Sequence, residues 1–513
     1  MTRNDSPSPS PVGSTASTRK SASLIDALLP VVVLILLLAL SVYLFGDDSS
    51  SGANQIALML GGGLATLIGL KNGYRWADIE AGVTKGMSLT LGAFLILFSI
   101  GALIGTWLLA GTVPSMIYFG LQLLNPDLFY VSSCILCAVV ALCIGSSWTV
   151  AATIGVALIG VATGMNLSPV ITAGAIVSGA YFGDKLSPLS DTTNLAPAIA
   201  GADLFSHIRH MLWSTVPAFL VSLLLFTLLG LQDGGDFSPE RLNQLTQGLE
   251  QHFALGWHLL LPLVITLGLA LAKVPAFAAI SIGAIVGGFW ALLFQQQLIA
   301  NLAAEGPTWQ QNVMVIWQAL YQGVSIDTGN SDLNDLVSGG GMGSMLGTVW
   351  LIMTAMYFGS VMETTGLLKR LVEGLIAAAH SGGRLIVTTI FTAFGVNVIS
   401  ADQYISVVMP ARMFKGAYGE RDLAPENLSR AIEDGGTVTS ALIPWNTCGA
   451  YMHSVLGVGP LEYALYAFFN WLSPLVGIVC ALFGWKVLKL PQAKAGLEQL
   501  QQRSTGNQNP ASA

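Results

Sequence analysis

Residues 128–183 read LFYVSSCILCAVVALCIGSSWTVAATIGVALIGVATGMNLSPVITAGAIVSGAYFG and contain no Asp, Glu, Lys or Arg. A helix that crosses a bilayer needs about 20 apolar residues, so a charge-free run of this length must fold back on itself inside the membrane. Residues 27–45, ALLPVVVLILLLALSVYLF, form a further uncharged stretch of spanning length. We therefore predict an all-α protein that crosses a membrane several times.

The composition of the whole chain supports a membrane protein. Of its 513 residues, 53% are hydrophobic and 10% are charged, with a mean hydropathy of +0.67. Soluble domains carry about 25% charged residues. Together with the two stretches above, the further apolar segments predict roughly a dozen spans. These segments are 211–231, 254–272, 274–298, 306–326, 336–362, 385–401, 437–461 and 463–485.

The two ends of the chain are polar, and both predict a cytoplasmic position. Residues 1–25 are rich in Ser, Pro and Thr, which is typical of a disordered tail. No small-residue cleavage site follows the first span, which therefore reads as an uncleaved anchor. Basic residues flank the outermost spans, so the positive-inside rule places both termini in the cytoplasm of a protein that we expect in the inner membrane. These basic residues are Arg3, Arg19, Lys20, Lys486, Lys489, Lys494 and Arg503.

Several function classes lack their sequence signatures. The formal charge of −7 is spread over the loops without a basic patch, so nucleic acid is not an expected partner. There is no Walker A sequence, His-Glu-x-x-His, Gly-x-Ser-x-Gly or dinucleotide fingerprint, and we expect neither an enzyme nor a cofactor. Cys134 and Cys137 lie in apolar sequence and are interpreted as packing groups. His207 and His210 are one helical turn apart without a further ligand, so no resident metal is predicted.

An internal repeat emerges when the sequence is shifted by 256 residues. Residues 166–169 (Asn-Leu-Ser-Pro) then fall on residues 422–425 (Asp-Leu-Ala-Pro), and Pro188 falls on Pro444. The identity between the halves is low, but the rare prolines coincide inside polar interruptions, a pattern typical of duplicated transporters. The predicted organisation is a disordered cytoplasmic tail (1–25), a first transmembrane repeat (26–230), a polar connection (231–253), a second transmembrane repeat (254–489) and a cytoplasmic tail (490–513).

The first polar interruption is residues 183–197, GDKLSPLSDTTNLAP. It holds two carboxylates, four hydroxyl groups, an amide and two prolines. Proline breaks a helix and frees carbonyl groups, and unwound backbone at membrane depth is tolerated where it lines a cavity. An ordinary solvent loop is the alternative, but this segment directly continues the charge-free run. Oxygen-rich ligands of this kind suit a hard cation such as Na⁺.

The second interruption has two parts, residues 396–410 and residues 433–447. Asp402 is the only charge in the first part, VNVISADQYISVVMP. A carboxylate alone in an apolar helix is a functional-site candidate by default, although it could also be a helix cap. It binds either a proton or a cation, so competition for one site would produce exchange. Glu433 and Asp434 have a simpler interpretation as partners of Arg430.

The same residues resemble the NhaC family of Na⁺/H⁺ antiporters. The resemblance covers most of the chain between the tails, and its motifs are long and specific. They are Gly145-Ser-Ser-Trp148, AYFGDKLSPLSDTTNLAP (180–197), HIRHM (207–211), DQY (402–404) and PENLSRAIEDGGTVTSALIPWNTCGAYM (425–452). The resemblance implies two inverted repeats, each with a helical hairpin and an interrupted helix, whose polar tips face each other. It also implies Na⁺ and H⁺ as transported ions, contact with the lipid bilayer, and a homodimer that works by an elevator motion.

The resemblance extends to individual residues. Those expected to bind the cation are Asp184, Ser187, Asp191, Thr192, Asn194, Asn397, Asp402, Asn446 and Thr447. Those expected to couple protons are Asp402, Asp191 and Asp434. The predicted function is exchange of Na⁺, or Li⁺, for H⁺ by alternating access. The alternative is an exchanger of organic acids such as malate and lactate, which would need a cationic counter-charge. Lys185 is the only cation inside the first polar interruption, and Asp184 or Asp191 is expected to neutralise it.

Overall fold

The computed structural model describes residues 20–45, 49, 52–233, 239–303, 306–379 and 381–490. The predicted tails lie outside these ranges, apart from residues 20–25 and residue 490. Within the described ranges the regular elements are helices, and no strand is found. The first half contains α1 (Leu24–Phe45), α2 (Ala53–Lys71), α3 (Trp76–Leu109), α4 (Thr112–Leu123), α5 (Phe129–Ile144), α6 (Ser147–Val150), η3 (Ala151–Gly155), α7 (Val156–Gly164), α8 (Pro169–Leu186), α9 (Asp191–Ala200), α10 (Leu204–Asp233) and α11 (Pro239–His252).

The second half is helical in the same way. It contains α12 (Leu261–Leu271), α13 (Ala276–Phe294), α14 (Gln296–Leu302), α15 (Thr308–Tyr321), α16 (Ser331–Val337), α17 (Leu346–Thr364), α18 (Leu367–Ala378), α19 (Gly382–Ser400), α20 (Gln403–Gly419), α21 (Pro425–Ile432), η6 (Glu433–Thr437), η7 (Ser440–Leu442), α22 (Thr447–Leu456), α23 (Pro460–Tyr463) and α24 (Phe468–Leu482). Here η3 and η6 are π-helical turns and η7 is a 3₁₀ turn.

The described helices confirm a multi-pass membrane protein. Nine of them are long and apolar enough to cross a bilayer, or ten if the bent pair Asn243–His252 and Trp257–Leu271 counts as one span. This is fewer than the predicted dozen. The predicted segments 306–326 and 463–485 contain helices of 14 and 15 residues, α15 and α24, which are too short to count as spans. The segment 437–461 is divided between η6, η7 and α22.

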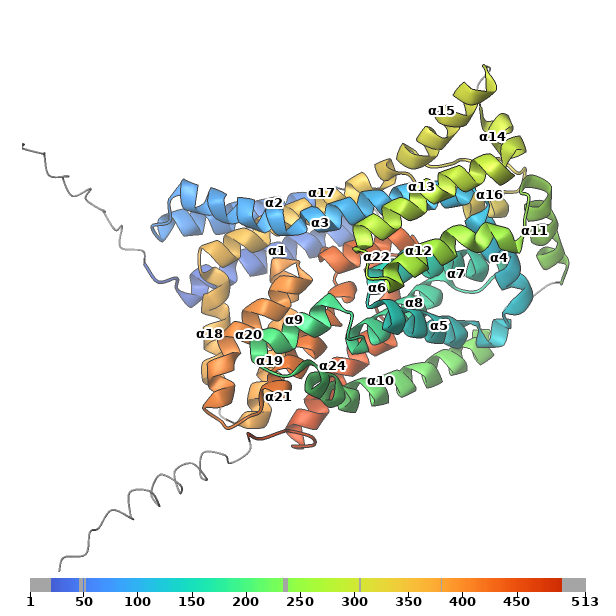
Figure 1. Cartoon of the computed structure of the whole chain (residues 1–513). Coiled ribbons are helices and arrows are strands. Elements are labelled where there is room, and N and C mark those ends of the chain that lie inside the picture. The colour runs from blue at the N-terminus through green and yellow to red at the C-terminus, as the bar shows by residue number, and fades with distance from the viewer. Residues whose placement is uncertain are drawn as a thin grey trace, which may run out of the picture.

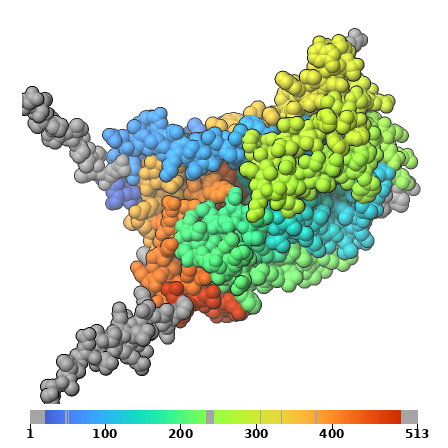
Figure 2. Space-filling model, viewed as in Figure 1, coloured from blue at the N-terminus to red at the C-terminus, as the bar shows by residue number. Residues whose placement is uncertain are grey.

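The helices form two groups in Figure 1. In the first group α17 packs on α2 and α3, and α13 packs on α3. In the second group α5 packs on α8, α10 on α24, and α19 on α20. The pair α14–α15 projects beyond the rest of the molecule (Figures 1 and 2). The polar interruptions belong to the second group, which therefore holds the candidate site.

Two hairpins in this second group turn by the same local device. Gly145 ends α5 with a φ of +76°, and Ala401 ends α19 with a φ of +57°. The next residue caps the following helix: Ser146 Oγ accepts from the Thr149 N–H (3.2 Å), and Asp402 Oδ1 accepts from the Ile405 N–H (2.9 Å). Ser and Asp are both preferred helix caps. The two turns are related by the 256-residue shift.

The helix bounds support the predicted repeat. Shifted by 256 residues, α6–α7 falls on 403–420, where α20 lies. In the same way α8 falls on 425–442, which α21, η6 and η7 occupy, and α9 falls on 447–456, the range of α22. Helices broken at matching positions mark the substrate sites of many transporters. The inverted orientation of the halves and their outer limits stay predictions.

Small residues let α5 and α8 approach closely. A Cβ atom at Gly179 would lie 2.1 Å from the carbonyl oxygen of Cys134. A Cβ atom at Gly183 would lie 2.2 Å from the carbonyl oxygen of Ala138. Close packing of helices through glycine is a main source of association inside membranes. Cys134 and Cys137 are buried free thiols in this interface, as their interpretation as packing groups requires.

Replacing Gly179 with Ala tests the importance of this contact. The added methyl group clashes with backbone, so we expect a loss of about 1–3 kcal/mol in the free energy of unfolding. The measurement is the thermal unfolding temperature in detergent. Gly63→Ala is the matched control, because a Cβ atom at Gly63 in α2 meets nothing within 4 Å. An equal effect of both variants would contradict the packing interpretation.

Candidate functional site

A cavity of about 710 Å³ lies where both hairpin turns meet both helix breaks. The first residues of α6, α9, α20 and α22 all line it. The helices therefore bring together four segments that are far apart in the sequence. The polar side of the cavity is formed by Ser146, Ser147, Trp148, Thr149, Asp184, Ser190, Asp191, Thr192, Asp402, Gln403, Tyr404 and Thr447.

The opposite wall of the cavity comes from the other group of helices. It consists of a mostly apolar stretch of α3, with Leu89, Ala93 and Ile96, and the segment 273–277, which includes the first two residues of α13. The cavity thus lies between the two groups. A site in this position can change its access when one group moves relative to the other.

Asp184 connects the end of α8 to the first hairpin turn through hydrogen bonds. Its side chain is 8% exposed, and its Oδ2 accepts hydrogen bonds from the Ser147 N–H (3.0 Å) and the Ser147 hydroxyl (2.7 Å). Hydrogen bonds to a carboxylate are roughly twice as strong as those between neutral groups. The interaction therefore holds the carboxylate in a fixed orientation at the cavity wall.

The charge of the cavity lining is predominantly negative. Asp184, Asp191 and Asp402 face a single lysine, Lys273. Asp191 and Asp402 also lie at helix N-termini, where a carboxylate offsets the partial positive charge of the helix end. Asp402 therefore acts as the helix cap considered in the sequence and lines the cavity as well. This charge balance favours a cation over an anion.

Two of the predicted cation ligands in the first interruption form hydrogen bonds within the helix break and do not line the cavity. The Asn194 amide donates to the carbonyl oxygens of Pro188 (2.8 Å) and Ser190 (2.7 Å). Ser187 Oγ accepts from the Leu189 N–H (3.2 Å). Neither side chain is part of the lining. Their direct role in cation binding stays a prediction, whereas their role in stabilising the break follows from these contacts.

Asn397 and Asn446 have the corresponding role in the second interruption. The Asn446 amide donates to Asn397 Oδ1 (3.1 Å), and the Asn397 amide donates to Gly436 O and to Thr439 Oγ1 (3.1 Å). Asn446 Oδ1 also accepts from the Cys448 N–H (3.0 Å), which caps α22. Both side chains are fully buried and lie outside the lining. Of the predicted cation ligands, the lining includes Asp184, Asp191, Thr192, Asp402 and Thr447.

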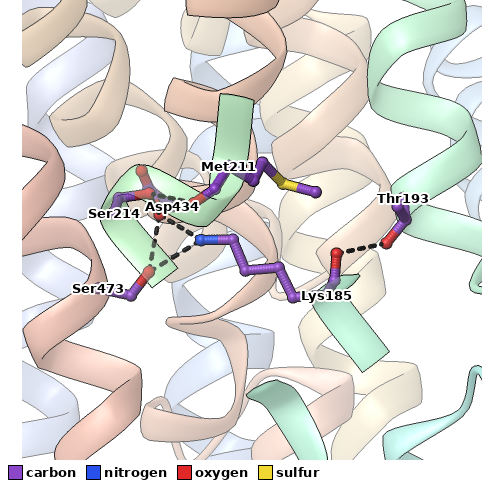
Figure 3. Close-up of polar contacts among 6 residues, drawn as sticks. All are labelled: Lys185, Thr193, Met211, Ser214, Asp434 and Ser473. Carbon is purple, nitrogen blue, oxygen red and sulfur yellow. Dashed lines mark hydrogen bonds and ion pairs between the residues drawn. The ribbon is translucent and has the colours of Figure 1, made fainter. Parts of the chain in front are cut away.

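Lys185 points away from the cavity and forms an ion pair with Asp434 (Figure 3). Both side chains are fully buried. The Ser473 hydroxyl lies 2.8 Å from the Lys185 ammonium and 2.7 Å from Asp434 Oδ1. The expectation that Asp184 or Asp191 neutralises Lys185 is therefore wrong. The partner is 249 residues away in the chain, and the fold alone brings the two together.

Arg430 also differs from its expected role. Among the described residues it forms no ion pair with Glu433 or Asp434, and its Nη1 atom lies 3.5 Å from the carbonyl oxygen of Lys486. The side chain is fully buried. The simple pairing expected for the two acidic residues is thus wrong, since Asp434 is held by Lys185.

The first hairpin turn is the part of the site that the residue-by-residue prediction missed. Ser146 and Ser147 are uncharged and lie within an apolar run, so composition gave no signal, although both belong to the Gly145–Trp148 motif of the family resemblance. The 256-residue shift would have found them, because it places Asp402 on Ser146. Trp148 also joins this turn to α22: its ring stacks on Tyr451 at 4.0 Å, and the Tyr451 hydroxyl donates to the Trp148 carbonyl (2.7 Å).

Comparison with known proteins agrees with this architecture. The Na⁺/H⁺ antiporter family matches residues 179–485. An uncharacterized Na⁺/H⁺ antiporter of Haemophilus influenzae is 36% identical over 480 residues, which cover 93% of this chain and 99% of the relative. The Na⁺/H⁺ antiporter NhaC of Alkalihalophilus pseudofirmus is 34% identical over 411 residues, covering 80% and 85%. A malate-2H⁺/Na⁺-lactate antiporter of Bacillus subtilis is 34% identical over 432 residues, covering 84% and 89%. The chain belongs to the Na⁺/H⁺ antiporter family.

Proposed function

We propose that this protein exchanges Na⁺, or Li⁺ in its place, for H⁺ across the membrane. The observation that carries the proposal is the acidic cavity at the junction of two broken helices and two hairpin turns. The cation would be bound by oxygen atoms of the lining residues Asp184, Asp191, Thr192, Asp402 and Thr447. Carboxylate and hydroxyl oxygens are the ligands that hard cations prefer. The relatives named as Na⁺/H⁺ antiporters support the same choice.

Exchange follows from competition for the carboxylates. Asp402 or Asp191 binds a proton when the cation has left and releases it when the cation returns. Each ligand thereby excludes the other. A carboxylate that has bound neither ligand is an unpaired charge, which is energetically unfavourable at membrane depth. If the cavity faces one side of the membrane at a time, inward movement of one ion requires outward movement of the other.

Exchange of organic acids is the second candidate. A cavity of about 710 Å³ has room for a dicarboxylate, and the malate-2H⁺/Na⁺-lactate antiporter is a relative. The charge of the lining opposes this candidate, because three carboxylates face one lysine. Lys185, the expected counter-charge, is bound to Asp434 outside the lining. Cation exchange is therefore the better supported function.

The proposal also covers the location of the protein, the orientation of its termini and its oligomeric state. The apolar helical spans support an inner-membrane location, and the basic residues that flank the outer spans support a cytoplasmic position of both termini. A homodimer in the lipid bilayer would provide a fixed frame against which the second group of helices moves.

The proposal is tested in proteoliposomes with an imposed pH gradient and a fluorescent pH probe. Na⁺, Li⁺, K⁺, malate and lactate are added one at a time. We expect Na⁺ and Li⁺ alone to dissipate the gradient. No response to Na⁺ alone, followed by a response once malate or lactate is present, would instead establish the organic-acid exchanger.

Replacing Ser147 with Ala should weaken Na⁺ binding. Asp184 loses one of its two hydrogen bonds from Ser147, and a bond to a charged group is worth about 1.5–3 kcal/mol. We expect the apparent KM for Na⁺ to rise about tenfold with little change in the maximal rate. Ser133→Ala is the matched control, because the buried Ser133 hydroxyl in α5 has no hydrogen-bond partner among the described residues. An unchanged KM in the Ser147 variant would remove this contact from the site.

A further inference from the structure

A second cluster of buried charges lies outside the cavity. Lys185, Glu433 and Asp434 have no exposed surface, and none of the three lines the cavity. The ion pair between Lys185 and Asp434 is completed by Ser473 and Ser214 (Figure 3). The cluster joins α8 and η6 to α10 and α24, so it connects the two interrupted helices on the side away from the lining.

Glu433 is the member of this cluster without a close partner among the described residues. Neither of its carboxylate oxygens has a hydrogen bond of good geometry or an ion pair there, and the Thr437 hydroxyl and the Lys185 charge act on it at longer range. The neighbouring Asp434 takes the Lys185 ammonium through Oδ1, while its Oδ2 is also without a partner. An isolated carboxylate anion is very costly in such surroundings, whereas the neutral acid is tolerated. The geometry therefore suits a carboxyl group that gains and loses a proton.

The cluster has a direct connection to the cation cavity. Asp184 and Lys185 are consecutive residues in the last turn of α8. Asp184 reaches the hairpin turn at the cavity, and Lys185 reaches Asp434. If Glu433 becomes an anion, Lys185 is shared between two carboxylates instead of one. A weaker ion pair between Lys185 and Asp434 would leave the end of α8 that carries Asp184 free to move.

Other titratable groups lie on several of the elements packed against the cluster. His207 and His210 lie on α10, and each has an Nε2 atom without a partner among the described residues. On α9, Asp191 faces the cavity instead. The remaining charged or titratable neighbours are Asp184 of α8, Tyr418 of α20, Arg430 of α21 and Cys480 of α24.

We propose that Glu433 is a second proton-binding site, which carries a proton in addition to the one that competes with the cation in the cavity. The inference rests on the proposed exchange function. In each cycle an O–H bond forms at the Glu433 carboxylate when the proton enters and breaks when it leaves to water. The extra proton makes the exchange move net charge, so the membrane potential drives it.

The test compares wild type with Glu433→Gln in proteoliposomes at zero pH gradient, with a membrane potential set by K⁺ and valinomycin. Uptake of radioactive Na⁺ is measured with and without the potential. We expect the potential to change the wild-type rate, whereas the Gln variant continues to exchange but no longer responds. Glu373→Gln is the control, because this glutamate lies on α18, is 46% exposed and, within the described ranges, pairs with Lys369 alone.

Three results would overturn the inference. The wild-type rate of Na⁺ uptake could be independent of the potential, or the Gln variant could respond to the potential like wild type. In the third case, the Gln variant would have lost Na⁺ transport altogether. Glu433→Asp distinguishes the loss of the proton-binding site from a folding defect, because it keeps a carboxylate at this position. We expect this variant to respond to the potential with a shifted pH profile, and an unshifted profile would also contradict the inference. Failure of the proposed function is distinguishable, because wild type would then move no protons with Na⁺ in the pH-gradient assay.

Discussion

Replacing Asp402 with Asn is expected to abolish Na⁺-driven proton movement while the protein still folds and inserts. The Asn side chain keeps an oxygen that can accept from the Ile405 N–H, so the start of α20 is preserved. It removes the negative charge that binds either the proton or the cation. Loss of such a group lowers the rate by about a hundredfold or more. The measurement is dissipation of a pH gradient by Na⁺ in proteoliposomes.

Asp203→Asn is the matched control for this variant. Asp203 precedes α10 and accepts from the Ser206 N–H (3.0 Å), so it caps a helix in the same way but lies outside the cavity lining. The backbone hydrogen bond from Ser206 holds the pKa of Asp203 below its usual value, so the control residue stays ionised at neutral pH. Wild-type exchange in the Asp402 variant would remove this residue from the mechanism.

Replacing Lys185 with Met is expected to destabilise the protein strongly. The change leaves the Asp434 carboxylate buried without its cation, which costs about 3–5 kcal/mol. We expect a marked fall in the thermal unfolding temperature in detergent. Replacing both partners, as in Lys185→Met with Asp434→Leu, should recover most of this loss, because no unpaired charge remains.

The matched control is Lys369→Met, since Lys369 is 68% exposed in its ion pair with Glu373. An exposed ion pair of this kind contributes about 0–1 kcal/mol to the free energy of unfolding. If the Lys185 and Lys369 variants unfold at the same temperature, the buried pair is not the stabilising contact described above.

The broken helices could be predicted from the sequence because their signals are local. Pro188 and Pro444 stand inside polar segments, and their spacing equals the repeat that the helix bounds also support. The lone carboxylate Asp402 marked the second hairpin turn, and the structure places it in the lining. Proline and isolated charges disturb a membrane helix wherever they occur, so no tertiary information was needed.

The partners of the buried charges could not be predicted in this way. Lys185 has two acidic neighbours in its own segment, Asp184 and Asp191, but the fold directs its side chain to Asp434. Asn397 and Asn446 offered oxygen atoms that looked suitable for a cation, yet they bond to each other. Which face of a broken helix points to the cavity depends on packing between the halves. The polar interruptions carry polar residues on every face of the broken helix, so the sequence does not show which face points to the cavity.

In the proposed exchange Na⁺ and H⁺ compete for the carboxylates of one cavity. The most direct measurement is the rate of Na⁺ transport by the wild-type protein in proteoliposomes, as a function of Na⁺ concentration at several pH values on the same side. Competition predicts that the apparent KM for Na⁺ rises as the pH falls, while the maximal rate at saturating Na⁺ stays constant. A KM that does not change with pH would show that Na⁺ and H⁺ do not compete for the same carboxylates.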